Sequence, residues 1–339
     1  MTAQTTSTAP GRGSAGVDMT ALMGSKLTLP NPVLTASGCA AAGRELNQFF
    51  DVSRLGAVVT KSIQLRARSG RATPRMAETP SGMLNSIGLQ GPGIDAFLRE
   101  DLPWLAQHGA RAMVSIAGSS TDDYVELTRR LLSNDAVTAI EVNISCPNVE
   151  KRGEVFACDP SATSRVISAV RRAADPRVAV FAKLTPDVTD IVAIAKACAD
   201  AGADGLSLIN TLLGLVIDTD SMAPALGGVT GGLSGPAILP VALRCVWQVH
   251  QALPHLPILG MGGIRSGLDA LQFVLAGASA VSVGTAVFGD PHAPVRVLAE
   301  LEDALARREF AALADAVGFA HLSGEEQIRR RGLSTGDLG

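Results

Sequence analysis

The sequence predicts a single (β/α)8 TIM barrel that carries an N-terminal hairpin and long excursions after its second and sixth strands. Short apolar runs alternate with segments of helical periodicity, a pattern typical of a parallel sheet. Eight such runs occur in 339 residues, a length at which an α/β barrel forms one domain. The alternative is an open, doubly wound sheet, and the strand count favours the barrel.

Each predicted element follows from a local pattern. Apolar, β-branched runs indicate the strands, and capping residues and glycines mark the ends of the helices. The strands are expected at residues 33–36, 56–60, 112–116, 138–142, 178–182, 205–209, 257–259 and 280–283. The helices are expected at residues 93–108, 121–133, 161–174, 185–201, 236–251, 266–276 and 294–308.

Segments outside this alternation complete the predicted organisation. Residues 26–36 are interpreted as a short hairpin that leads into the first strand. Residues 63–90 and 212–234 are glycine-containing excursions, and excursions of this length are usually functional loops or lids. We expect a disordered tail at residues 1–22, the barrel at 23–312, and a helical extension with a tail at 313–339.

The composition predicts a large core and argues against a nucleic-acid ligand. Hydrophobic residues make up 47% of the chain and charged residues 18%, which is sufficient for a large buried core. Aromatic residues make up only 4%, which favours tightly packed helix-on-sheet layers over a β-sandwich. The net charge is −3, and the one basic run is short (329–331), so no nucleic-acid partner is expected.

The cysteine usage predicts a reduced protein. Cys39, Cys146, Cys158, Cys198 and Cys245 are scattered and never spaced as CxxC, so no disulfide framework, zinc site or iron–sulfur ligand set is expected. No apolar run is long enough to span a bilayer, and the first twenty residues lack the apolar core of a signal peptide. We therefore expect a cytoplasmic protein that does not associate with a membrane.

Polar residues collect at one end of the predicted strands. The active sites of (β/α)8 barrels lie at the C-terminal ends of the strands. In chain order, those ends carry Ser37, Lys61, Ser115, Asn143 with Cys146, Lys183, Asn210 with Thr211, the pair Gly262 and Gly263, and the pair Gly284 and Thr285. Polar residues with purely structural roles would be scattered over both ends, so this arrangement predicts one site.

The segment 141–148 is the strongest single signal. It begins as a buried strand and continues into a loop that contains Asn143, Ser145, Cys146 and Asn148. Amide, hydroxyl and thiol groups are costly to bury without partners, and a thiol with cationic neighbours can act as a base near neutral pH. The alternative interpretation is a polar strand exit with a buried structural thiol.

The other strand ends indicate an anionic, planar ligand. The glycine turns after strands 7 and 8 each open a helix, and the exposed backbone amides there suit a phosphate. Lys61 and Lys183 can balance the negative charge of a substrate or of a reduced flavin ring. A ligand edged with amide and carbonyl groups suits the amide side chains of this region. They are Asn85, Asn143, Asn148 and Asn210.

A set of motifs in chain order resembles one family. The motifs are TKS at 60–62, NSIGL at 85–89, NISCPN at 143–148, INT at 209–211, GGLSGPA at 231–237, GMGG at 260–263 and GT at 284–285. On these residues the chain resembles the class 1 dihydroorotate dehydrogenases, flavin enzymes that make orotate in pyrimidine biosynthesis. The stretch 148–160 and the GGLSGPA motif are most similar to the catalytic subunit of the NAD-using (class 1B) branch.

The resemblance implies an FMN-binding barrel with the cofactor and substrate at its mouth. The implied FMN contacts are Ser37, Lys61, Ser62, Ser115, Asn143, Lys183, Ile209, Gly235, Gly262, Gly263, Gly284 and Thr285. The implied dihydroorotate contacts are Lys61, Asn85, Ser86, Ile87, Gly88, Leu89, Asn143, Asn148, Asn210 and Thr211. By the same resemblance, Cys146 is the general base that removes a proton from C5 of (S)-dihydroorotate, and a hydride passes from C6 to N5 of FMN.

The resemblance also implies a partner. The NAD-using branch works with an electron-transfer subunit that carries FAD and a 2Fe-2S cluster, so a homodimer or a heterotetramer is expected. The sequence leaves the physiological electron acceptor open: NAD through the partner, fumarate or another. Two positions depart from the family pattern, because Gly91 stands where asparagine is common and Ser115 where asparagine often contacts the flavin.

Three alternative functions stay open at this point. Another flavin barrel that acts on a dihydropyrimidine would share the fold and the cysteine. A non-flavin, phosphate-binding barrel, such as an isomerase or aldolase, would use the glycine turns without a flavin. A non-catalytic barrel would serve as a partner subunit or scaffold, and the set Lys61, Asn143, Cys146 and Lys183 argues against it.

Overall fold

A ring of parallel strands forms the centre of the molecule. The computed structural model describes residues 16–132, 134–144 and 158–330. Within these ranges, eight strands pair in the order β3-β16-β15-β10-β9-β8-β7-β4. They are β3 (Val33–Thr35), β4 (Val58–Val59), β7 (Ala112–Ile116), β8 (Val137–Asn143), β9 (Ala179–Leu184), β10 (Gly205–Leu208), β15 (Ile258–Met261) and β16 (Ala280–Val283).

The ring closes between β3 and β4. A parallel bridge joins Leu34 to Ala57, and the amide of Gly56 donates a hydrogen bond to the carbonyl of Val33 (2.8 Å). Residue 56 must be glycine for this approach, because a Cβ would lie 2.3 Å from the carbonyl oxygen of Asn31. The predicted closed barrel is confirmed, and its strand ends differ from the expected ones by a few residues.

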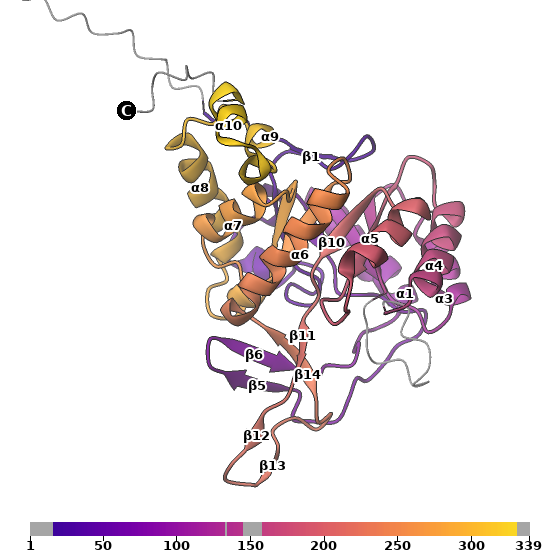
Figure 1. The fold of residues 1–339 in the computed structure, drawn as a ribbon. Coiled ribbons are helices and arrows are strands. Elements are labelled where there is room, and N and C mark those ends of the chain that lie inside the picture. The colour runs from indigo at the N-terminus through magenta and orange to yellow at the C-terminus, as the bar shows by residue number, and fades with distance from the viewer. Residues whose placement is uncertain (1–15, 133, 145–157, 331–339) are drawn as a thin grey trace, which may run out of the picture.

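Helices surround the barrel (Figure 1). In the first of them, α1 (Ile94–Ala96), a π-helical turn (Phe97–Asp101) and α2 (Leu102–Gln107) run on without a break. The others are α3 (Thr121–Leu131), α4 (Pro160–Ala173), α5 (Ile191–Asp200), α6 (Leu239–Ala252), α7 (Gly267–Leu275) and α8 (Ala293–Ala306). Among the described residues, no helix is both long enough and apolar enough to cross a membrane.

The start of α5 differs from the expected one. The sequence predicts a helix from Thr185, whereas α5 begins at Ile191 because the carboxylate of Asp190 caps its first turn. Thr185 instead forms a turn in which its hydroxyl accepts a hydrogen bond from the amide of Asp187 (3.1 Å). The Asp187 carboxylate also accepts one from the amide of Leu213 (3.1 Å), so this turn anchors the second excursion.

The two predicted excursions pair with each other in a second, antiparallel sheet. The first supplies β5 (Met76–Thr79) and β6 (Gly82–Asn85), and the second supplies β11 (Leu212–Gly214) and β14 (Gly231–Ser234), in the order β11-β14-β6-β5. A short hairpin of β12 (Ile217–Asp218) and β13 (Ala223–Pro224) extends from it. This sheet and hairpin project from the barrel at the bottom of Figure 1.

The two described ends of the chain lie against each other. β1 (Ala21–Leu22) and β2 (Thr28–Leu29) form the hairpin, one segment earlier than predicted, because the residues after Pro32 enter the barrel as β3. Asp18 bridges to Ala312, and α9 (Leu313–Ala316), a 3-10 turn (Phe319–His321) and α10 (Gly324–Arg330) follow. The boundaries predicted at residues 22 and 312 stay predictions.

His250 on α6 is enclosed by two glycines. A Cβ at Gly277 would lie 2.1 Å from the His250 ring, and one at Gly318 would lie 2.5 Å from it. The ring of His321 packs against it with a centroid distance of 4.9 Å, and Nδ1 of His250 has no hydrogen-bond partner among the described residues. Burial, followed by the charges of His321 and His255, lowers the pKa of His250.

The stability of the protein is therefore expected to fall as the medium is acidified. The folded state favours the neutral imidazole, so the contribution of His250 is complete above the unfolded-state pKa of about 6.5 and is lost as the pH falls through the lower folded-state pKa. Comparing Tm between about pH 8 and about pH 5 measures this loss. His250→Phe should flatten the decline, whereas the exposed His255→Gln should keep most of it, because burial is the largest cause of the lowered His250 pKa. An unchanged decline in His250→Phe would contradict this role.

Candidate active site

A cavity of about 320 Å³ opens at the C-terminal ends of the barrel strands. Its walls come from the ends of β3, β9, β10, β15 and β16 and from the sheet of the excursions. The predicted cofactor and substrate residues in its lining are Ser37, Lys183, Ile209, Asn210, Thr211, Gly235, Gly262, Gly263, Gly284 and Thr285. The structure thus brings these residues, which are far apart in sequence, to the place and the size of cavity in which such barrels bind ligands.

Three hydroxyl groups and one amide form a hydrogen-bonded chain beside this cavity. Ser62 Oγ lies 3.3 Å from Ser37 Oγ and 3.0 Å from Ser115 Oγ. Asn143 Nδ2 donates to the same Ser62 oxygen (3.0 Å), and the backbone carbonyl of Asn143 accepts from the hydroxyl of Tyr124 (2.8 Å). Because Asn143 is buried, the first bond orients its side chain and the second fixes its backbone at the point where β8 ends.

An ion pair lies buried between β8 and β9. Lys183 Nζ lies 3.6 Å from Glu141 Oε1, with the lysine side chain 4% and the glutamate side chain 0% exposed. No described residue donates a hydrogen bond to either carboxylate oxygen of Glu141. Lys183 is therefore the one described counter-charge near that carboxylate, and a buried charge without a partner is strongly destabilising.

Lys61 lies beside the main cavity and not in its lining. It lines a neighbouring cavity of about 380 Å³, together with Thr60, Arg68 and Gln90. Its Nζ is also close to Gly38, because a Cβ there would lie 3.6 Å from it. Gly38 stands between two residues that line the main cavity, so the amino group of Lys61 is near that lining as well.

The predicted substrate segment belongs to the first excursion and is hydrogen-bonded to the second. It consists of Asn85, Ser86, Ile87, Gly88 and Leu89. Asn85 Nδ2 donates to the carbonyl of Gly232 (3.2 Å), and Ser86 Oγ accepts from the guanidinium of Arg71 (3.3 Å). Met83, on the same strand as Asn85, lines the main cavity, whereas this segment does not. Its contact with a substrate stays a prediction.

The predicted general base lies outside the described residues. Cys146 lies in the segment 145–157, which the structure does not describe. Asn148, which is predicted to contact the substrate, lies in the same segment. The described chain ends at Ile144, directly after Asn143, and continues at Cys158. The roles of Cys146 and Asn148 therefore stay predictions.

Two lining residues did not emerge from the sequence as candidates. Cys39 is half-buried in the cavity wall. Burial raises its pKa to about 11, against the opposing charges of Lys183 and Lys61, so this thiol is protonated at neutral pH and is a poor base. The exposed Arg265 adds a second cation to the lining. Both follow a strand end within four residues, so the strand-end pattern includes them when it is extended into the loops.

The comparisons with known proteins agree on one family. The sequence model of the dihydroorotate dehydrogenase family matches residues 20–305. Two relatives share the name "Dihydroorotate dehydrogenase B (NAD(+)), catalytic subunit". The one from Anoxybacillus flavithermus is 50% identical over 297 residues, which cover 88% of this chain and 91% of the relative. The one from Pelobacter propionicus is 52% identical over 292 residues, which cover 86% and 95%. The chain belongs to the dihydroorotate dehydrogenase family.

Proposed function

We propose that this protein oxidises (S)-dihydroorotate to orotate in pyrimidine biosynthesis, with FMN as its cofactor. Membership of the family supports the reaction. The observation that carries the proposal is the cavity at the strand ends, which combines glycine-rich loops with Lys183, Asn210 and Thr211. A flavin phosphate, a developing negative charge and the amide edge of a dihydropyrimidine would each find a matching group there.

The shape of the cavity supports FMN. Its wall includes the loops after β15 and β16, the position at which (β/α)8 barrels frequently bind phosphate. Gly263 has a φ of 81°, and a Cβ there would lie 2.9 Å from the carbonyl oxygen of Gly235, so this wall requires glycine. Gly262, Gly263, Gly284 and Thr285 would hold the phosphate. The remaining contacts would come from Ser37, Lys61, Ser62, Ser115, Asn143, Lys183, Ile209 and Gly235.

Different residues of the chain would remove the proton and bind the substrate. Cys146 would take the proton from C5 of dihydroorotate as a general base. Bound FMN would supply the oxidant, which accepts the hydride from C6. The substrate ring would lie among the asparagine side chains, with Asn143 held in place by its bond to Ser62. The full set of proposed substrate contacts is Lys61, Asn85, Ser86, Ile87, Gly88, Leu89, Asn143, Asn148, Asn210 and Thr211.

Lys183 would stabilise negative charge that develops in the cavity. A cation in a site that excludes water is worth more than one in bulk solvent, provided that it is positioned before the reaction. Lys183 is 4% exposed, and the Glu141 carboxylate lies 3.6 Å from its amino group. Glu141 itself does not line the cavity. We therefore propose that Glu141 positions the amino group of Lys183.

We further propose that the protein passes electrons to a second subunit. The relatives carry "catalytic subunit" and "NAD(+)" in their names, which supports such a partner. The partner would carry FAD and a 2Fe-2S cluster, and the assembly would be a homodimer of this chain or a heterotetramer with the partner. We place the reaction in the cytoplasm, with residues 1–22 as the segment before the barrel, 23–312 as the FMN-binding barrel and 313–339 as an extension.

A comparison of two substrates tests the proposed function. The purified protein, supplied with FMN and an artificial electron acceptor, should oxidise dihydroorotate and leave dihydrouracil, which lacks the carboxylate, almost unchanged. Turnover of dihydrouracil in place of dihydroorotate would favour a different dihydropyrimidine enzyme. A colourless protein that takes up no FMN would favour a phosphate-binding barrel without a flavin.

A further inference from the structure

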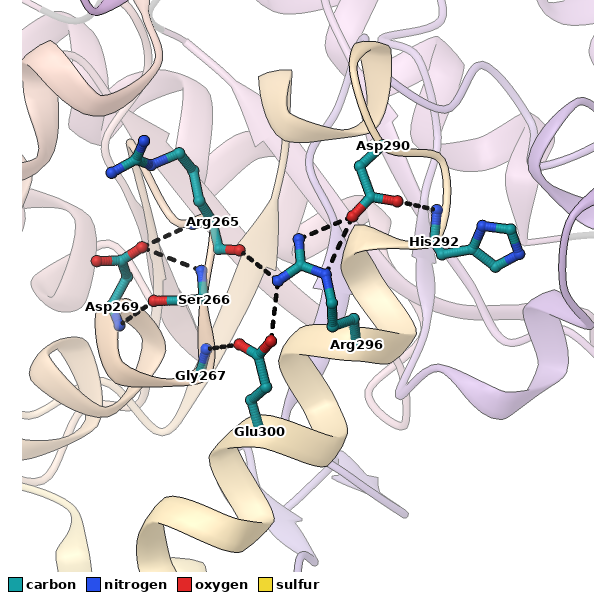
Figure 2. A network of polar contacts seen from close by, with 8 residues as sticks. All are labelled: Arg265, Ser266, Gly267, Asp269, Asp290, His292, Arg296 and Glu300. Atoms are coloured by element: carbon teal, nitrogen blue, oxygen red, sulfur yellow. Dashed lines mark hydrogen bonds and ion pairs between the residues drawn. The ribbon is translucent and has the colours of Figure 1, made fainter.

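We propose that Arg296 sets the spacing of the two loops that would hold the FMN phosphate, and that it acts as a positioning residue for the cofactor. This inference rests on the proposed FMN site. The first phosphate loop is residues 262–266, after β15, and the second is residues 284–292, after β16. Arg296 lies on α8, outside the cavity lining, and contacts both loops (Figure 2).

The guanidinium of Arg296 joins three segments of the chain. Its Nε and Nη2 donate to Asp290 Oδ2 (3.0 and 2.8 Å), in the second loop. Its Nη1 donates to the carbonyl oxygen of Arg265 (3.0 Å), in the first loop, and to Glu300 Oε1 (3.0 Å), one turn further along α8. We call Asp290, Arg296 and Glu300 the loop clasp. Only a planar, forked cation can bind these acceptors together.

The first loop is fixed at the point where the clasp holds it. The amides of Arg265 and Ser266 both donate to Asp269 Oδ2 (3.0 Å each), and the amide of Gly267 donates to Glu300 Oε2 (2.7 Å). A Cβ at Gly267 would lie 2.3 Å from the backbone of Glu300, so α7 begins in direct contact with α8. A shift of the clasp would therefore shift the end of the first loop.

The second loop connects Asp290 to the cavity lining. The amide of Asp290 donates to the carbonyl of Ala286 (3.0 Å), and Asp290 Oδ1 accepts from the amide of His292 (3.0 Å). Ala286 and Gly289 both line the cavity. The hydrogen bonds from Arg296 lower the pKa of Asp290, so its carboxylate stays charged at neutral pH and the clasp stays closed.

The clasp is too exposed to be a large part of the overall stability. The side chains of Arg296, Asp290 and Glu300 are 41%, 39% and 39% exposed, and ion pairs at such exposure contribute little to unfolding free energy. Opening the clasp should therefore leave the barrel folded and change the distance between the loops. The backbone amides of both loops would then no longer reach one phosphate together.

Titration of the full-length apoprotein with FMN and with riboflavin tests the inference, because riboflavin lacks the phosphate. We expect Arg296→Met to raise the Kd of FMN about tenfold and to leave the Kd of riboflavin unchanged. A tenfold change corresponds to the loss of about one charge-assisted hydrogen bond. Arg296→Lys should lie between Arg296→Met and wild type, because lysine keeps the charge without the fork. Asp290→Ala opens the same clasp. If Arg296→Met fails to fold, Asp290→Ala should give the same changes in Kd.

A matched control uses the next arginine pair of the same helix. Arg307 binds Asp303 (2.5 Å) at the far end of α8, so Arg307→Met should change neither Kd. Equal weakening of FMN and riboflavin in Arg296→Met, or an unchanged Kd of FMN, would overturn the positioning role while leaving the FMN site in place. A wild-type protein that binds FMN no more tightly than riboflavin would overturn the phosphate site and this inference with it.

Discussion

Replacement of Cys146 by alanine is expected to slow the reduction of bound FMN by dihydroorotate about 100- to 10,000-fold, the usual contribution of a general base. The bound flavin should remain, because the proposed cofactor contacts other than Asn143 lie at other strand ends. Cys39 should not take over, since its raised pKa of about 11 keeps that thiol protonated at neutral pH. Stopped-flow absorbance of the flavin under anaerobic conditions measures the rate.

The pH dependence of the same reaction separates a base from a structural thiol. In the wild type, flavin reduction should accelerate as the pH rises and the thiol loses its proton. Cys146→Ser keeps the size of the side chain and should lose this dependence together with the rate. Cys158→Ala, an exposed thiol that bonds weakly to the carbonyl of Asp187 (3.9 Å), is the control and should behave as the wild type. Unchanged kinetics in Cys146→Ala would remove it as the base.

Lys183→Met is expected to lower the free energy of unfolding by about 3–5 kcal/mol, because it leaves the Glu141 carboxylate buried without a counter-charge. Urea unfolding measures this loss. The double variant Lys183→Met/Glu141→Gln removes the buried charge and should recover much of the stability. It should not recover the rate of flavin reduction, because the cation that we assign to the cavity is still absent.

The lysine at position 26 provides the matched control for this ion pair. Lys26 Nζ lies 2.6 Å from Asp204 Oδ1, but both side chains are partly exposed, and Arg171 also binds the same carboxylate (2.8 Å). Lys26→Met should therefore change the free energy of unfolding by about 1 kcal/mol or less. A Lys183→Met protein as stable as the wild type would contradict the buried pair. Recovery of the reduction rate in the double variant would contradict the catalytic role.

The barrel could be predicted because each of its strands is encoded locally. Strands such as β8 and β9 are buried on both faces and therefore appear as near-continuous apolar runs. The start of α5 was predicted wrongly because two Asp-containing turns follow each other, and only the capping by Asp190 decides between them. The pairing of β6 with β14 joins segments far apart in the sequence, and no local pattern encodes such a contact.

The sequence predicted part of the candidate site as well. The strand-end rule located the lining residues that carry hydroxyl, amide or amino groups, such as Ser37, Asn210 and Lys183. It did not identify Glu141 as the partner of Lys183, because the role of a carboxylate inside an apolar run is evident only when the fold shows which cation lies next to it. The loop clasp was missed for the same reason: Arg296 and Asp290 are ordinary surface charges in the sequence, and only the fold brings them to the carbonyl of Arg265.

Anaerobic mixing of the purified protein with dihydroorotate tests the central claim most directly. The flavin absorbance in the visible region reports the cofactor, and chemical analysis of the mixture reports the product. The proposed function predicts rapid bleaching of the flavin together with the formation of one orotate for each flavin reduced. A yellow protein whose absorbance stays unchanged with dihydroorotate would contradict the assigned substrate, and a protein that holds no flavin would contradict the assigned cofactor.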